Sequence, residues 1–230
     1  MTGVAPAGPL HGCRAALARG AVLGVALAAT SAPWIEPAQA EATGARPACV
    51  AIDHPFRPST LTIDGVLPPT AVIGRGQDRH GVPKPPPLTE RGKWQLAWDK
   101  ASGVRPGGTA GVVRLTAHTY PLDHPDDRPR RRPGDAARAP ALGNLLLARL
   151  QAGAGLHVTG AGGEQVCYRV TRRQQVRATA SLSGYYDTTG APRLAILVCS
   201  GTRRGPGDWT HRTIWWAQPV ATRDGAARES

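Results

Sequence analysis

Residues 193–220 read RLAILVCSGTRRGPGDWTHRTIWWAQPV, and this stretch decides the fold. Its first part, 194–198, is a continuous apolar run that predicts a strand buried on both faces and ending at Cys199. Glycine, proline and aspartate at 205–208 predict a turn, and a second strand begins at Arg212. Because the adjoining ends of an antiparallel pair are neighbours, we expect Cys199 and Arg212 to face the same cleft.

A thiol beside a fixed positive charge is a candidate nucleophile, because the thiolate attacks and nearby cations lower the thiol pKa. The proton shuttle that such a nucleophile needs is predicted at His118, which ends the apolar segment 111–117. His211 is the alternative base, since it adjoins Arg212, but no apolar strand precedes it. Taken singly, each residue fits ordinary packing or surface roles; their order and strand context together favour a catalytic set.

Three blocks of the chain resemble the catalytic blocks of sortases, the cysteine transpeptidases of Gram-positive cell surfaces. They are LTAHT at 115–119, LAILVC at 194–199 and HRTIWWA at 211–217. The resemblance covers roughly residues 59–220 and is strongest to the actinobacterial class F or class E type. Two positions depart from the family pattern: Val198 stands where sortases usually carry threonine, and Ala117 where many carry glycine.

The fold class predicted is all-β. The 230 residues include 28 glycines and 22 prolines, a composition that favours short strands and many turns. Strands are predicted at 61–66, 70–73, 94–98, 111–117, 156–159, 165–176, 194–198 and 212–216. Leucines at helical spacing predict a short helix at 142–150. We therefore expect a closed eight-stranded β-barrel with one or two short helices, which is also the barrel that the sortase resemblance implies.

The N-terminal segment has the pattern of an export signal. Two arginines precede the apolar stretch 21–32, and small residues at 38–40 fit a cleavage site. The predicted organisation is a signal peptide or N-terminal membrane anchor at 1–40, a linker at 41–58, a catalytic barrel at 59–220 and a polar tail at 221–230. We expect the catalytic part outside the cytoplasm, at the cell surface, either secreted or anchored to the plasma membrane.

The net charge of +12 comes largely from arginines at 128–138 and from Arg172 and Arg173. No zinc spacing, aromatic ribonucleoprotein pattern or basic helix accompanies them, so nucleic acid is not an expected partner. The simplest interpretation is solvated basic loops, and the alternative is attraction to an acidic wall or membrane.

The cysteines after residue 40 are Cys49, Cys167 and Cys199, an odd number that leaves at least one thiol free. We predict that Cys199 is the free one. Cys167 lies in a strand pattern and is interpreted as a small buried hydrophobic residue, with a Cys49–Cys167 disulfide as the alternative. No cysteine and histidine spacing fits a zinc site, and neither a metal nor a cofactor is expected.

Three loops are predicted near the candidate site. Residues 81–88 are proline-rich and cannot form a central strand, and 121–140 form a surface loop that either shapes the rim of the site or is an inert insertion. The third loop is 181–190, directly before the cysteine strand, and in sortases the corresponding segment covers the peptide groove. That resemblance makes Tyr185 and Tyr186, together with Val198, candidate substrate contacts, with ordinary aromatic packing as the alternative.

The resemblance implies acyl transfer on a sorting motif of the Leu-Pro-x-Thr-Gly kind. Cys199 would attack the threonine carbonyl, His118 would move the protons, and Arg212 would hold the developing oxyanion. An amine of the cell wall or of a pilin would resolve the thioester, and we expect a monomer. The alternatives are a thiol hydrolase of the same motif and a secreted, non-catalytic barrel that binds wall polymer. The His-Gly-x-Cys cluster of the thiol transpeptidases that act on peptidoglycan stems is absent.

Overall fold

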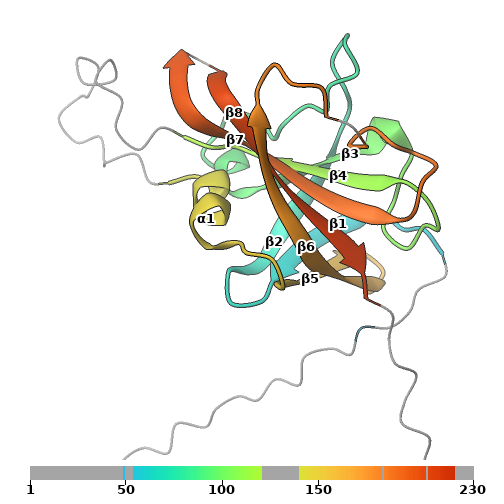
Figure 1. Cartoon of the computed structure of the whole chain (residues 1–230). Helices are drawn as coiled ribbons and strands as arrows, with labels where there is room; N and C mark the ends of the chain where they lie inside the picture. The colour runs from blue at the N-terminus through green and yellow to red at the C-terminus, as the bar shows by residue number, and fades with distance from the viewer. Residues whose placement is uncertain (1–48, 50–53, 121–139, 183, 206, 221–230) are drawn as a thin grey trace, which may run out of the picture. The chain divides into compact units, whose positions relative to one another are not determined.

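Eight strands close into a barrel in the computed structural model, which describes residues 49, 54–120, 140–182, 184–205 and 207–220 (Figure 1). The strands are β1 (Pro58–Ile63), β2 (Leu67–Arg75), β3 (Leu96–Asp99), β4 (Val112–Ala117), β5 (Gly155–Gly160), β6 (Gln165–Arg177), β7 (Arg193–Gly205) and β8 (Asp208–Pro219). The helical elements are α1 (Leu142–Arg149) and two single 3₁₀ turns, η1 (Gly92–Trp94) and η2 (Lys100–Ser102). The prediction of a closed eight-stranded all-β barrel is confirmed.

Neighbouring strands follow the order β1-β2-β3-β4-β7-β8-β6-β5, and β5 pairs with β1 to close the ring. Six of these pairings are antiparallel. Two are parallel: β2 with β3, and β4 with β7. The parallel β4–β7 pair matters most for the site, because it sets the end of β4 beside Val198, the residue before Cys199.

Side chains alternate strictly between the barrel interior and its outer surface along β4 and β7. Val113, Leu115 and Ala117 of β4 lie in the main hydrophobic core, as do the alternate residues of β7, which are Leu194, Ile196 and Val198. Side chains one step along a strand point to the opposite face. Residues 112, 114 and 116 of β4 and residues 195, 197 and 199 of β7 therefore face outward.

A second, smaller hydrophobic cluster lies on that outer surface. It contains Val112, Ala195, Ile214 and Trp216 of the sheet, packed against Tyr185 of the segment between β6 and β7. The tyrosine ring is in edge contact with Trp216 at a centroid distance of 6.4 Å. The segment before β7 thus covers part of the outer face of β4, β7 and β8.

The β7–β8 hairpin is longer than the sequence pattern predicts. The predicted loop from Ser200 to His211 is instead mostly strand, interrupted by a register shift between Ser200 and Arg203 and closed by a tight turn (Figure 1). Gly201 adopts a φ of 78° at the shift, a conformation that glycine reaches without steric cost. Cys199 consequently lies within β7 and not at its end.

Several predicted segments fall outside the described residues: 1–40, most of the linker 41–58, most of the loop 121–140, and the tail 221–230. Every described residue belongs to the compact unit Arg46–Ser230. The barrel takes in part of the predicted linker, since Phe56 is buried in the core and its amide donates to the Pro106 carbonyl. None of the described helices is long and apolar enough to span a membrane.

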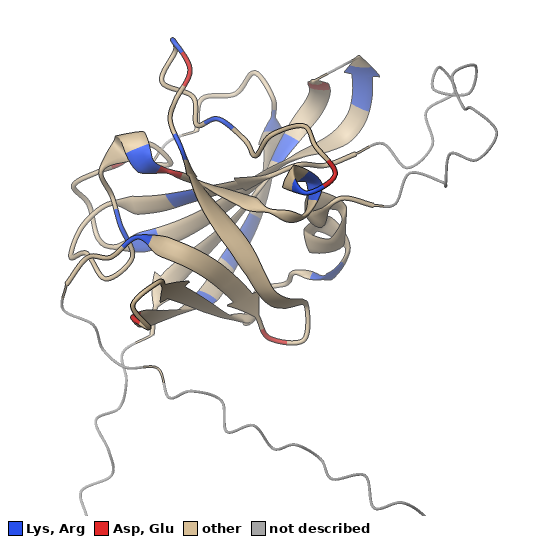
Figure 2. Cartoon of the chain, turned by 180° about the vertical axis from the view of Figure 1, so that it is seen from behind, with Lys and Arg blue, Asp and Glu red and all other residues tan. Residues whose placement is uncertain are grey.

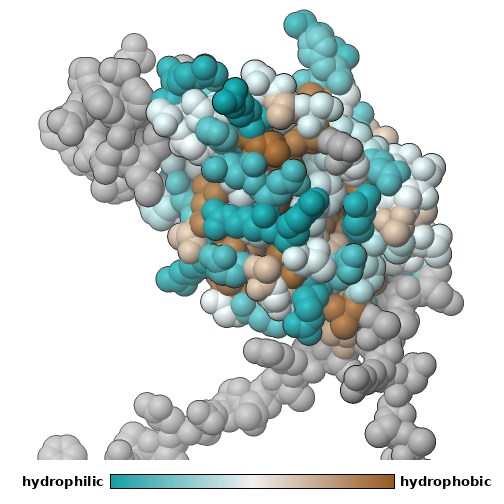
Figure 3. Space-filling view, in the orientation of Figure 1, coloured by the Kyte–Doolittle hydropathy of each residue, from teal (hydrophilic) through white to brown (hydrophobic). Residues whose placement is uncertain are grey.

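The described basic residues do not form a single stripe. Lys and Arg are spread over strands and loops in Figure 2, and hydrophilic side chains cover most of the face in Figure 3, with smaller hydrophobic areas between them. Arg172 and Arg173 lie over the rings of Trp216 and Trp215, at 5.7 and 5.4 Å from the ring centroids. Part of their role is therefore to cover aromatic surface.

Candidate active site

The strand register brings His118, Cys199 and Arg212 to one level of the sheet. Cys199 lies directly opposite Arg212 in the antiparallel β7–β8 pair. Ala117 is paired with Val198 in the parallel β4–β7 pair, so His118 follows at the level of Cys199. Two adjacent strands thus carry Cys199 and Arg212, and His118 is the first residue after the neighbouring strand β4.

The side chains of Cys199 and Arg212 belong to the same face. Cys199 is one step beyond the inward-facing Val198 in β7, and residues opposite one another in a pair share a face. His211, the alternative base, is paired with Ser200 and therefore faces the other way. A β-carbon on Gly201 would sit 2.6 Å from its Nδ1, which confirms that this imidazole lies over Gly201. The geometry rules out His211 as partner of Cys199.

A backbone carbonyl holds the imidazole of His118. Its Nε2 lies 2.6 Å from the carbonyl oxygen of Pro86, in the predicted proline-rich loop. A carbonyl can only accept, so Nε2 carries a proton and Nδ1 is the basic nitrogen of the neutral ring. Burial lowers the pKa of His118, and the Pro86 carbonyl opposes that effect only in part. The neutral imidazole is therefore the resting form near neutral pH.

The start of α1 supports the segment that carries His118. The Gly143 amide donates to the His118 carbonyl at 2.8 Å. The side chain of Asn144 accepts from the Tyr120 amide at 3.0 Å and donates to the Tyr120 carbonyl at 2.8 Å. A β-carbon at Gly143 would overlap the His118 carbonyl oxygen, so only glycine allows this close approach. Residues 118–120 are thus fixed from both ends.

Cys199 is a free, partly exposed thiol, as predicted. Burial raises its pKa, and the nearby Arg212 guanidinium lowers it by a smaller amount. The expectation that a neighbouring cation would leave the thiol with a low pKa is therefore wrong in its net direction, because desolvation outweighs the charge. The resting site pairs a neutral thiol with a neutral imidazole.

Arg212 is anchored by its own hairpin. Its Nη1 donates to the carbonyls of Trp209 at 3.4 Å and His211 at 3.0 Å. Among the described residues, Nε and Nη2 make no hydrogen bond, so donors remain for an anion placed beside the sulfur. A guanidinium keeps its charge at any physiological pH and holds its donors in a fixed plane.

The three predicted substrate contacts have different surroundings. Val198 is fully buried in the barrel core, and Tyr185 is 1% exposed within the outer cluster. Their side chains cannot touch a peptide in this conformation, so both are corrected to packing residues. Tyr186 is 45% exposed and lies in edge contact with Tyr185, at 5.1 Å between centroids.

The remaining two cysteines of the described chain form a disulfide, Cys49–Cys167. Cys167 is buried as expected, but the leading interpretation of it as an unpaired hydrophobic residue is wrong. Together with His157 these cysteines place three ligand-type atoms within 4.8 Å of one another. The sulfurs are bonded to each other, however, so neither is a thiolate ligand for a metal in this state.

Sequence reasoning missed the groups that hold His118. Pro86 acts through its backbone carbonyl, which no residue pattern reveals. Gly143 and Asn144 had a detectable signal, since they open the predicted helix just after the histidine-bearing segment and its loop. A glycine in the first turn of a short helix costs stability unless close packing requires it.

Comparison with solved structures finds similar folds among sortases. Streptococcus agalactiae sortase C1 in complex with MTSET is 14% identical, with 73% of this chain and 69% of that chain covered and a TM-score of 0.46. Streptococcus suis sortase C1 is 15% identical over 76% and 77% of the two chains, TM-score 0.46. A lid mutant of Corynebacterium diphtheriae sortase A is 16% identical over 72% of each chain, TM-score 0.46. No protein-family model and no curated protein matches the sequence.

Proposed function

We propose that the protein is a sortase-type cysteine transpeptidase that cleaves an LPXTG-like sorting motif between threonine and glycine. The observation that carries this proposal is the register pair of Cys199 with Arg212, beside a strand, β4, that ends one residue before His118. The three sequence blocks that resemble sortase blocks are the same three strands that converge there. Assignment to class F or class E rests on those blocks.

In the first half-reaction, the Cys199 sulfur attacks the threonine carbonyl carbon and the carbonyl π electrons move to its oxygen. The free donors of Arg212 bind the resulting oxyanion. Nδ1 of His118 takes the thiol proton and delivers it to the departing glycine amine. Collapse of the intermediate breaks the Thr–Gly bond and leaves a thioester on Cys199.

In the second half-reaction, an amine of the cell wall or of a pilin attacks the thioester. His118 removes the amine proton, and Cys199 leaves as the thiol. Tyr186, exposed beside the outer cluster, is the one predicted aromatic contact that a bound peptide can reach. The proposal includes a monomer at the cell surface, secreted or anchored through residues 1–40, and a reaction that needs neither metal nor cofactor.

A peptide assay tests this function directly. A fluorogenic peptide with an LPXTG-like motif is incubated with the protein, with and without an amine acceptor. Ligated product supports transpeptidation, and we expect Cys199→Ala to abolish it because no thioester can form. Cleavage without ligation would support the hydrolase. No turnover, with wall binding unchanged in Cys199→Ala, would support the binding barrel.

The pH profile should be a broad bell. Activity requires one proton shared by the Cys199 and His118 pair, which exists only between the two pKa values. Burial lowers the pKa of His118, so the acid limb falls below that of a free imidazole. Burial raises the pKa of Cys199, so the alkaline limb lies above that of a free thiol. Measurement of kcat/KM against pH checks this, and a narrow bell would contradict it.

Gly143→Ala should lower kcat/KM by about tenfold or more, because a shift of the His118 backbone by even a fraction of an ångström misplaces the base. The added methyl would overlap the His118 carbonyl oxygen. Helix propensity alone predicts the opposite, a gain in stability. Gly76→Ala is the matched control, since a β-carbon there meets nothing within 4 Å. Equal activity of the two variants would refute the positioning role of Gly143.

A further inference from the structure

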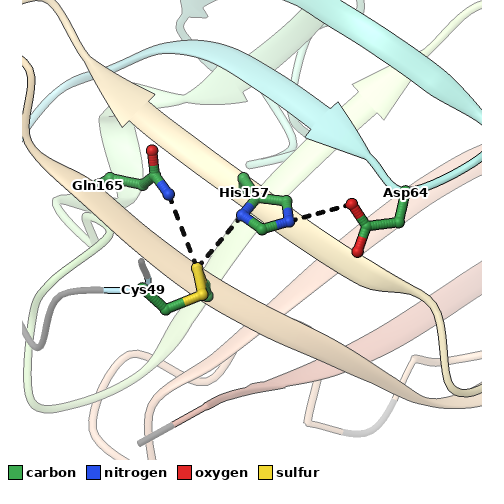
Figure 4. Close-up of a disulfide and its surroundings, with 5 residues drawn as sticks. Cys49, Asp64, His157 and Gln165 are labelled. Carbon is green, nitrogen blue, oxygen red and sulfur yellow. Dashed lines mark hydrogen bonds and ion pairs between the residues drawn. A yellow bond between two sulfur atoms is a disulfide. The ribbon is translucent and has the colours of Figure 1, made fainter. Parts of the chain in front are cut away.

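A second group of reactive side chains lies away from the candidate active site. It comprises Cys49, Asp64, His157 and Cys167, with Gln165 beside them (Figure 4). Cys167 accepts a hydrogen bond from the Val220 amide, just past the C-terminal end of β8, whereas Arg212 lies near the beginning of that strand. The proposed transpeptidation uses none of these side chains.

Strand pairing holds His157 between an acid and a sulfur. β5 runs between β1 and β6, so His157 has Thr62 on one side and Cys167 on the other. Its Nε2 lies 3.2 Å from Oδ1 of Asp64, in the turn after β1, and its Nδ1 lies 3.3 Å from Cys167 Sγ. A β-carbon at Gly155 would overlap the other Asp64 oxygen, so that glycine leaves room for the carboxylate.

The carboxylate fixes which nitrogen faces the sulfur. Asp64 accepts from Nε2, so Nδ1 is the nitrogen that gains the proton when the ring becomes an imidazolium. That proton then points at Cys167 Sγ. The charged groups facing His157 are Asp64 from the turn after β1 and, once the disulfide opens, Cys167 from β6 and Cys49.

The two sulfurs of the disulfide have unequal surroundings. The Gln165 amide also reaches Cys167 Sγ, at 3.8 Å, so this atom has one donor, and it gains a second when Nδ1 of His157 carries a proton (Figure 4). No hydrogen bond to the Cys49 sulfur occurs in the part of the chain that the structure describes. Cys167 is 4% exposed, while Cys49 is partly exposed. An incoming thiolate therefore reaches Cys49 more easily, and negative charge is better stabilised on Cys167.

We propose that Cys49–Cys167 is an exchangeable disulfide, opened by small-molecule thiols at Cys49 with Cys167 as the leaving group beside His157. The thiolate RS⁻ forms a bond to Cys49 Sγ while the Sγ–Sγ bond breaks, and its electron pair goes to Cys167 Sγ. The Nδ1 proton of the His157 imidazolium pairs with or protonates that thiolate. A second RS⁻ then attacks the mixed disulfide, giving RSSR and the Cys49 thiolate, so two thiols reduce one disulfide.

The proposal makes the attachment of residue 49 to β6 depend on whether the disulfide is oxidised or reduced. The disulfide joins residue 49, which precedes β1, to β6, with 118 residues between the two cysteines. Opening it removes the covalent link between residue 49 and β6 without touching Cys199. Opening of the Cys49–Cys167 disulfide can thus be tested separately from the proposed transpeptidase chemistry.

The test is reaction of the oxidised full chain with reduced glutathione, in a Cys13→Ala, Cys199→Ala background so that no thiol outside the disulfide takes part. Samples are quenched with acid, alkylated and mapped by peptide mass spectrometry. We expect the first mixed disulfide on Cys49. His157→Gln should open the disulfide about tenfold more slowly, because glutamine cannot protonate the departing Cys167 thiolate.

His80→Gln is the matched control, because that imidazole is exposed and lies in a different loop. It should keep the parent rate. Asp64→Asn should fall between the parent and His157→Gln, since it removes the carboxylate that orients the His157 ring toward Cys167. A first adduct on Cys167, or an unchanged rate in His157→Gln, would overturn the proposal. The adduct position is read in the parent protein, so this test stands even if a variant does not fold.

Discussion

Arg212→Ala is expected to lower kcat/KM for cleavage of the sorting peptide by about 100- to 1,000-fold, the cost of losing one oxyanion donor in other enzymes. The physical reason is the register pair between Cys199 and Arg212, which sets the guanidinium beside the attacking sulfur. The loss should appear in kcat and in kcat/KM alike, because the oxyanion is absent from the bound substrate and forms only along the reaction, in the tetrahedral intermediate and the transition states beside it.

Arg212→Lys separates charge from geometry. Lysine keeps the positive charge but lacks the planar fork of donors, so it should restore little of the activity. Arg204→Ala is the control, since Arg204 lies in the same hairpin and is paired only with the exposed Asp208. Steady-state kinetics of the three variants show whether activity depends on the charge at position 212 or on the planar geometry of its donors. Arg212→Ala with near-parental kcat/KM would remove this residue from the proposed mechanism.

Asp99→Asn should destabilise the protein by about 3–5 kcal/mol, because it leaves the Arg114 charge buried without a counter-charge. Asp99 Oδ2 accepts from Arg114 Nη1 at 2.9 Å and from Gln77 Nε2 at 2.8 Å, and the acidic side chain is fully buried. The guanidinium also lies 5.3 Å from the ring centroid of Tyr186. Urea unfolding of the purified variant measures the loss in the free energy of unfolding.

The surface pair Arg204–Asp208 provides the control for this prediction. Its side chains are 58% and 51% exposed, so Asp208→Asn should change the unfolding free energy by less than about 1 kcal/mol. Replacing both buried partners by apolar residues, Asp99→Leu with Arg114→Met, should recover most of the loss. If Asp99→Asn proves as harmless as Asp208→Asn, the buried pair contributes nothing to stability.

Much of the fold follows from local pattern. The eight strand segments, the helix near 142–150 and the closed barrel could be predicted because apolar runs and turn residues mark each element. The turn-forming residues after Cys199 led to a wrong prediction of a loop. In the structure Gly201 lies at a register shift within the hairpin, and Gly205 is paired with Asp208. A bulge and a loop share the same residue types, so composition alone does not separate them.

The candidate site was only partly predictable. The order of His118, Cys199 and Arg212 along three strands was visible in the sequence, but the inward direction of Val198 was not. The run 194–198 is apolar throughout, so it carries no alternation to show which side chains face the core. The Cys49–Cys167 pairing depends on closure of the whole barrel, and the carbonyl of Pro86 belongs to the backbone; neither leaves a local signal.

The parallel pairing of β4 with β7 has a consequence for how the chain reaches its working state. Ala117 and Val198 are neighbours in that pair although 81 residues separate them along the chain (198 − 117). Contacts so distant in sequence form late and slow the folding of β-rich domains. Base and nucleophile therefore meet only after the long crossover has closed, and a nascent chain carries an inert thiol until its topology is complete.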